Sequence, residues 1–288
     1  MMIKTQKKQF KLSDLLTYVV LVIVGFITLV PLLYALFASF KTNAEIFSHP
    51  EMFFPQKWTF DNYKMAFESE VFNVKRMLFN SFYYSAIYVI GTMLVSSMAG
   101  YAFARGNFPF KKTIFAVFSA LLFINLGSIT IYPLFDILAK IRLNSSLFGL
   151  LLLKIFGLNV VHMYLVKSYV TTLPIQVEEA AKIDGCSTWR VFFSIVVPLL
   201  KPIFATIAIL SFQSSWNEYL MPQIFTSSLP EQRTLIVGIV ALKNSGEAAA
   251  ASNLMLAGTV LSLIPVIVVY IVCNKYFISG LSAGAVKG

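Results

Sequence analysis

The sequence predicts an all-α, polytopic membrane protein with six transmembrane helices and a short cytoplasmic helix between the fourth and the fifth. Of its 288 residues, 58% are hydrophobic and 27 are Phe, and the mean hydropathy is +0.76. A soluble domain of this length has too little interior to bury so much apolar surface. Long uncharged runs recur along the chain, and the charged residues gather between them. The predicted solvent for most of the chain is therefore a lipid bilayer.

Six apolar segments are long enough to cross about 30 Å of hydrocarbon as helices. A basic N-terminal segment, 1–14, precedes them, and a Gly-rich tail, 278–288, follows the membrane domain 15–277. The first segment lacks the short apolar core and cleavage site of a secretory signal peptide, so we expect it to be retained. The predicted spans lie at about 15–40, 78–104, 113–135, 145–166, 195–220 and 254–274.

The distribution of Lys and Arg predicts the orientation of the chain. With a cytoplasmic N-terminus, the inner segments hold 13 Lys and Arg against 4 Asp and Glu, and the outer segments hold 9 against 8. Basic residues concentrate in cytoplasmic loops, so both termini are predicted to be cytoplasmic. The net charge of +10 is scattered between the spans, which indicates topology signals rather than a nucleic-acid surface.

A polar segment, 173–198, interrupts the apolar sequence on the predicted cytoplasmic side. Pro174 has no N–H to donate and suits the first turn of a helix, whereas Gly185 suits the left-handed residue that ends one. The residues between them are rich in Ala, Glu and Lys, which are good helix formers. A short helix is therefore predicted over 175–184.

The composition of this short helix favours a protein partner over the bilayer surface. Helices that rest on a membrane usually have a polar face rich in Lys and Arg and large apolar anchors. Here Glu178 and Glu179 suit the positive end of the helix dipole, and Ala180 and Ala181 let another chain approach closely.

Three motifs stand out in the sequence. The first is Glu179-Ala180-Ala181, followed after three residues by Gly185, after nine more by Ile195 and after two more by Pro198. The second is Trp216-Asn217-Glu218-Tyr219, and the third is the tail from Gly280 to Gly288. The first motif resembles the EAA loop of ATP-binding-cassette importer permeases, although Val197 stands where that family usually has Leu. The other two resemble the MalG-type permeases of carbohydrate importers, and the resemblance covers nearly the whole chain.

The resemblance implies a transport subunit and not an enzyme. Its partners would be a second permease chain in a heterodimer, two ATPase subunits and an extracytoplasmic solute-binding protein, in a bacterial or archaeal cytoplasmic membrane. This chain would bind no cofactor, and ATP and Mg would lie on the ATPase subunits. The implied ATPase-coupling residues are Glu178, Glu179, Ala180, Ala181, Asp184 and Gly185, and the implied C-terminal docking residues are Gly284 and Lys287.

Lys154, Asn217 and Glu218 are candidate pathway or gate residues because charged and polar groups are expensive inside a bilayer. Lys154 either lines the translocation route or pairs with a polar group of the partner permease. Glu218 lies near the predicted outer boundary of the membrane. There it either acts as a gate, contacts the binding protein or is simply solvated. His162 has only one other His in the chain, His49, so a metal site lacks ligands.

Two other functions are open to the sequence. One is a permease for another small solute, and the other is a membrane-embedded enzyme acting on lipid-linked sugars, which would need convergent acidic or metal-binding residues at one membrane face. The turn 106–113 comes close to a phosphate-binding P-loop, but Lys111 occupies the place of the second Gly and no strand precedes it. ATP is therefore expected on a different polypeptide.

Overall fold

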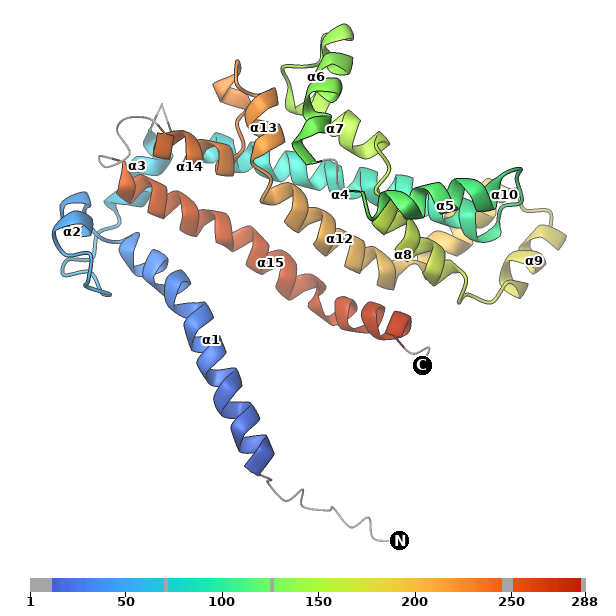
Figure 1. The fold of residues 1–288 in the computed structure, drawn as a ribbon, viewed down its shortest axis with the longest axis horizontal. Coiled ribbons are helices and arrows are strands. Elements are labelled where there is room, and N and C mark those ends of the chain that lie inside the picture. The colour runs from blue at the N-terminus through green and yellow to red at the C-terminus, as the bar shows by residue number, and fades with distance from the viewer. Residues whose placement is uncertain (1–11, 70–71, 125–126, 245–250, 286–288) are drawn as a thin grey trace. The chain divides into compact units, whose positions relative to one another are not determined.

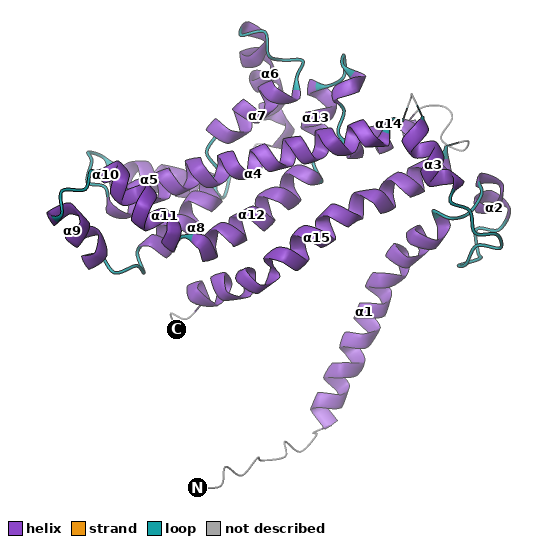
Figure 2. Ribbon diagram, turned by 180° about the vertical axis from the view of Figure 1, so that it is seen from behind, coloured by secondary structure: helices purple, strands orange, loops and turns teal. Residues whose placement is uncertain are grey.

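A computed structural model of the chain describes residues 12–69, 72–124, 127–244 and 251–285. Every regular element within these ranges is a helix (Figures 1 and 2), which confirms the predicted all-α class. The chain divides into two compact units. One consists of 1–68 with 242–260, and the other consists of 69–241 with 261–288.

The first unit contains one long apolar helix and two short ones. These are α1 (Leu12–Ala38), α2 (Asn43–Ser48) and α3 (Asp61–Glu68), joined by the beginning of α15 (Ser252–Ala285). The buried Asn62 holds the unit together: its Nδ2 donates to the carbonyls of Ser39 and Lys41 at 2.7 Å each, and its Oδ1 accepts from Asn253 Nδ2 at 2.8 Å. Residues far apart in sequence are thus joined by one amide.

The second unit is organised around α4, a continuous helix of 32 residues that packs against α7, α8 and α12. Figure 1 shows α4 and α12 running side by side. The elements of this unit are α4 (Val74–Arg105), α5 (Lys111–Leu121), η1 (Gly127–Thr130), α6 (Ile131–Lys140), α7 (Leu147–Phe156), α8 (Val160–Val170), α9 (Gln176–Ile183), α10 (Thr188–Val191), η2 (Phe192–Val196), α11 (Val197–Leu199), α12 (Lys201–Trp216), α13 (Leu220–Phe225), η3 (Pro230–Gln232), most of α14 (Leu235–Asn244) and the rest of α15.

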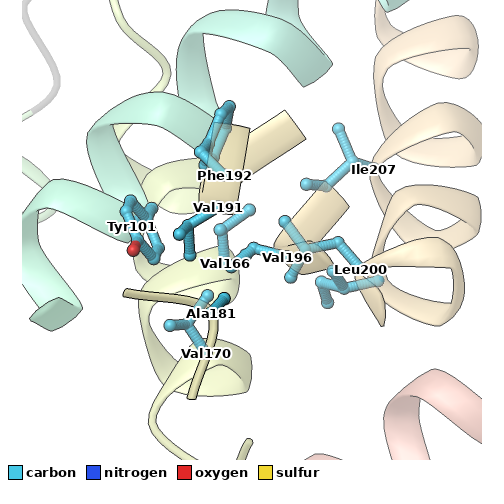
Figure 3. Packing of buried hydrophobic residues seen from close by; sticks show 10 residues of the cluster. Tyr101, Val166, Val170, Ala181, Val191, Phe192, Val196, Leu200 and Ile207 are labelled. Carbon is cyan, nitrogen blue, oxygen red and sulfur yellow. The ribbon is translucent and has the colours of Figure 1, made fainter. Parts of the chain in front are cut away.

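Two hydrophobic cores lie along α4. The first surrounds Tyr101 and gathers residues from α8, α9, the bent region before α12 and α12 itself (Figure 3): Val166, Val170, Ala181, Val191, Phe192, Val196, Leu200, Ile203 and Ile207. The second surrounds Tyr84 and Tyr88 and includes Leu138, Leu147, Leu150, Leu151 and Phe225. Close approach of α4 and α8 depends on Gly100, since a Cβ there would lie 2.7 Å from Val166 Cβ and 2.9 Å from the Met163 carbonyl oxygen.

The predicted count of six spans is not confirmed. Three helices of the described chain are long and apolar enough to cross a membrane, at Asp14–Ala38, Val74–Arg105 and Ser252–Cys273. Two bent pairs, Leu147–Phe156 with Val160–Val170 and Thr188–Leu199 with Lys201–Trp216, bring the number to five if each pair is one span.

The remaining predicted span, 113–135, is not one helix. It is divided between α5, which ends at Leu121, and α6, which begins at Ile131. Gly127, between them, has a φ of +53°, in the left-handed region that a continuous helix cannot contain. Pro133 lies in the first turn of α6, where its missing N–H interrupts no helical hydrogen bond. Hydropathy alone did not reveal this break.

Two prolines explain the 77° bend before α12. Neither Pro198 nor Pro202 can donate a backbone hydrogen bond to the preceding turn. Immediately before Pro198 the helix widens to the π form over Phe192–Val196, and the Val197 N–H donates to the carbonyl of Phe192. The chain therefore turns sharply at Leu200 and continues as α12.

Candidate functional site

The structure has a helix, α9, within the polar loop, at Gln176–Ile183. Glu178 and Glu179 lie in its first turn and Lys182 in its last, which matches the helix dipole at both ends. Gly185 follows with a φ of +79° and lets the chain leave the helix in the left-handed conformation. The signals at Pro174 and Gly185 thus located the helix to within one residue at each end.

The two faces of α9 differ sharply. Glu178 and Ala181 are buried against the rest of the chain, with 4% and 7% of their surfaces exposed. Glu179, Ala180 and Asp184 are exposed, as is Gly185. The predicted coupling residues are therefore split into an inward pair and an outward group.

Glu178, one of the implied ATPase-coupling residues, is bonded within its own chain. Its Oε1 accepts from Arg105 Nε at 2.8 Å, and its Oε2 accepts from Tyr101 Oη at 2.9 Å. Arg105 also donates through Nη2 to the Leu173 carbonyl at 2.7 Å. The sequence predicted five of the six coupling residues to lie on this helix and Gly185 to end it, but only packing decided that Glu178 and Ala181 face inward.

An apolar side chain on the exposed surface of α9 escaped the sequence analysis. Ile183 is 86% exposed, and Ile175 and Val177 are each 44% exposed. Ile183 directly precedes Asp184 and therefore lies beside the outward group of coupling residues.

Lys154 and Glu218 come together in the second unit as a salt bridge. Tyr84 Oη donates to the same Glu218 oxygen, Oε2, at 2.7 Å, and Lys154 Nζ lies 4.9 Å from the centre of the Tyr88 ring. Both tyrosines are buried, and the Lys154 and Glu218 side chains are 20% and 18% exposed. Sequence reasoning singled out both charged residues but did not pair them with each other.

The other sequence-predicted residues lie outside these two networks. Asn217 is exposed and ends α12, where its backbone N–H donates to the Gln213 carbonyl. His162 is buried, with Nδ1 3.5 Å from Ser211 Oγ. Gly284 belongs to the last turns of α15, and Lys287 lies outside the described residues. Within the described residues, no group of three His, Cys, Asp or Glu side chains is placed to hold a metal ion.

The long apolar helices of the described chain define an integral membrane protein. The chain belongs to the family of binding-protein-dependent transport system inner membrane components, whose model matches residues 96–282. That match includes α9 and its flanking spans, so the chain is a permease subunit and not an enzyme.

Individual relatives agree over nearly the full chain. The sulfoquinovosyl glycerol transport system permease protein SmoH of Agrobacterium fabrum is 35% identical over 90% of this chain and 89% of its own. The galactooligosaccharides transport system permease protein GanQ of Bacillus subtilis is 34% identical over 95% of each. A chain in the crystal structure of a bacterial ABC transporter that imports the acidic polysaccharide alginate superposes with a TM-score of 0.78 at 25% identity, covering 94% of this chain and 100% of that one.

Proposed function

We propose that the chain is one permease subunit of an ATP-driven importer of a sugar or oligosaccharide. The observation that carries the proposal is the exposed outer face of α9, in a chain whose relatives include permeases named for galactooligosaccharide and arabinooligosaccharide transport. The substrate class rests on those relatives.

The proposed coupling surface is the outward group of residues on and just after α9: Glu179, Ala180, Asp184 and Gly185. These residues are exposed, and the small side chain of Ala180 leaves room for a partner's backbone. An ATPase subunit would receive this surface in a cleft, with ATP and Mg bound on that subunit. Closure of the ATPase pair would then displace α9 and tilt the spans between outward-open and inward-open states.

The assembly we propose has a second, different permease chain, two ATPase subunits and an extracytoplasmic solute-binding protein. Family membership supports the ATPase and binding-protein partners, and the charge distribution between the spans supports cytoplasmic termini. The membrane would be the cytoplasmic membrane of a bacterium or archaeon. Gly284 and Lys287 would add a C-terminal docking contact to the ATPase.

Lys154, Asn217 and Glu218 are proposed to act along the translocation pathway. The salt bridge between Lys154 and Glu218 supports a gate that opens when the pair separates, because ionisable residues among membrane spans commonly pair and line solute pathways. Asn217 is exposed beside Glu218 and would contact passing solute or the binding protein.

The decisive experiment is reconstitution of this chain with its co-purifying subunits in liposomes, followed by uptake of a panel of radiolabelled oligosaccharides, a polyamine and phosphate. We expect one sugar class to be accumulated with ATP and to stimulate ATP hydrolysis when its binding protein is present. Glu179→Lys should abolish ATPase association and uptake while the chain stays in the membrane. Import of polyamine or phosphate and of no sugar would establish the alternative permease instead, and unimpaired uptake by Glu179→Lys would exclude α9 as the docking surface.

A further inference from the structure

A half-buried residue, Arg105, and a buried one, Glu178, connect α9 to the C-terminal end of α4. We propose that this pair is the joint that makes α4 move with α9, so that Arg105 and Glu178 are positioning residues for energy coupling. The inference rests on the proposed function, because it assigns the path by which displacement of α9 enters the membrane helices.

The geometry of the joint fixes orientation as well as distance. Arg105 reaches two groups at once, Glu178 Oε1 and the Leu173 carbonyl just before α9, while Tyr101 holds the second Glu178 oxygen. A guanidinium is planar, so donors bound to two different groups fix the direction in which both lie. The Arg105 and Glu178 side chains are 16% and 5% exposed, so water competes little for these bonds.

A second contact prevents α9 from pivoting about the charge pair. Ala181, one turn after Glu178, lies in the hydrophobic core with Val170 of α8 and Val191 of α10 (Figure 3). With both residues of its inner face held, α9 has its outer face left for a partner. A push on that outer face is therefore transmitted to α4 and α8 and does not merely rotate α9.

The same α4 helix reaches the other charged network. Tyr84 and Tyr101 are 17 residues apart (101 − 84) on a helix without Pro, and 1.5 Å per residue separates them by about 25 Å. Tyr101 binds Glu178 at one end, and Tyr84 binds Glu218 at the other. An unbroken helix with a bonded group at each end can relay a displacement of α9 to the Lys154–Glu218 salt bridge.

The first experiment measures the binding of ATPase subunits separately from the coupling of ATP hydrolysis to uptake. In the reconstituted importer, Glu178→Ala and Arg105→Ala should keep ATPase subunits bound, because Glu179 and Ala180 on the outer face are unchanged. Uptake, and the stimulation of ATP hydrolysis by loaded binding protein, should fall by about tenfold or more, within the usual range of coupling between two sites. Arg105→Lys should give partial coupling because an ammonium lacks the planar fork.

A charge exchange separates a coupling role from a merely structural one. The double variant Arg105→Glu with Glu178→Arg should recover coupling above either single exchange. The matched control is Asp136→Asn, which removes one member of the exposed pair with Lys140 on α6 and should leave coupling unchanged. Any of three results would overturn the proposed joint. They are wild-type coupling in Glu178→Ala, loss of ATPase association in that variant, and no recovery of coupling in the double exchange.

A measurement on the purified chain keeps the proposal testable without the importer. Spin labels at the exposed positions Ile183 and Phe110, with Cys186 and Cys273 replaced by Ser, report the distance between α9 and the turn after α4. We expect one narrow distance distribution that broadens in Glu178→Ala, and an unchanged distribution overturns the joint. If the wild-type assembly imports nothing and binds no ATPase, the proposed function is wrong. If the wild-type assembly imports normally and replacing Glu178 leaves its coupling unchanged, only the proposed role of the Arg105–Glu178 pair is wrong.

Discussion

Lys154 and Glu218, 64 residues apart in sequence, form a salt bridge in which Glu218 also accepts the hydroxyl of the buried Tyr84. Three parts of the chain meet there: the end of α7, the residues just after α12 and the N-terminal half of α4. Each charge in the pair compensates the other, and the ring of Tyr88 lies beside the ammonium. Two residues that are expensive separately in a membrane are therefore tolerated together.

Removing one member of this pair should destabilise the chain more than removing both. Lys154→Met leaves the Glu218 carboxylate uncompensated, with an expected loss of about 3 kcal/mol in the free energy of unfolding. Lys154→Met combined with Glu218→Gln should restore most of that loss, since a neutral amide needs no counter-charge and its oxygen can still accept from the Tyr84 hydroxyl. Thermal unfolding in nanodiscs measures both variants.

Uptake by the same double variant separates the two roles of Lys154. A stable double variant that imports at the wild-type rate assigns the pair to structure alone. A stable double variant that fails to import assigns it to the pathway or gate.

Gly100 should be intolerant of any side chain. A methyl group there would lie 2.7 Å from Val166 Cβ and 2.9 Å from a backbone oxygen of α8, so one helix must shift. We expect Gly100→Ala to destabilise the chain by about 1–3 kcal/mol, as overpacked cores do. Gly25→Ala is the matched control, because nothing lies within 4 Å of its added Cβ. Equal melting temperatures for the two variants would contradict the close approach of α4 and α8.

Gly185 should tolerate Asn better than Ala or Val. Its added Cβ would meet no neighbour, so strain arises only from the φ of +79°. A left-handed conformation costs a residue with a Cβ about 1–2 kcal/mol, and Asn adopts it more readily. Uptake rates should therefore fall in the order Gly, Asn, Ala, Val. An Ala variant more active than the Asn variant would show that side-chain size, and not backbone conformation, limits this position.

Asn62→Leu should loosen the first unit locally. The change removes two donors to the Ser39 and Lys41 carbonyls and the acceptor of Asn253 Nδ2. Each buried group left unpaired costs about 1–3 kcal/mol. Hydrogen exchange over 39–68 should become faster, while α4 keeps its protection. Lys57→Ala, an exposed substitution in the same segment, should change neither region.

The elements found correctly from sequence are those with local causes. Pro174 and Gly185 bound α9 because a missing N–H and a left-handed φ act within one turn of chain. Continuous apolar runs predicted α1, α4 and the membrane part of α15, because the transfer of each residue from water to lipid adds to one summed free energy along the run. The segment 113–135 defeated that reasoning, because its hydropathy is high whereas Gly127 adopts a conformation that breaks a helix.

Composition and local helix signals were enough to predict the helical membrane class, the position of α9 and the charged residues among the apolar spans. Which of those residues meet depends on the packing of the helices: Glu178 faces inward and binds Arg105, Glu179 stays exposed, and Lys154 pairs with Glu218. Composition and helix signals are read along the chain, over a few residues at a time. A salt bridge across 64 or 73 residues depends on how whole helices pack, which no local pattern records.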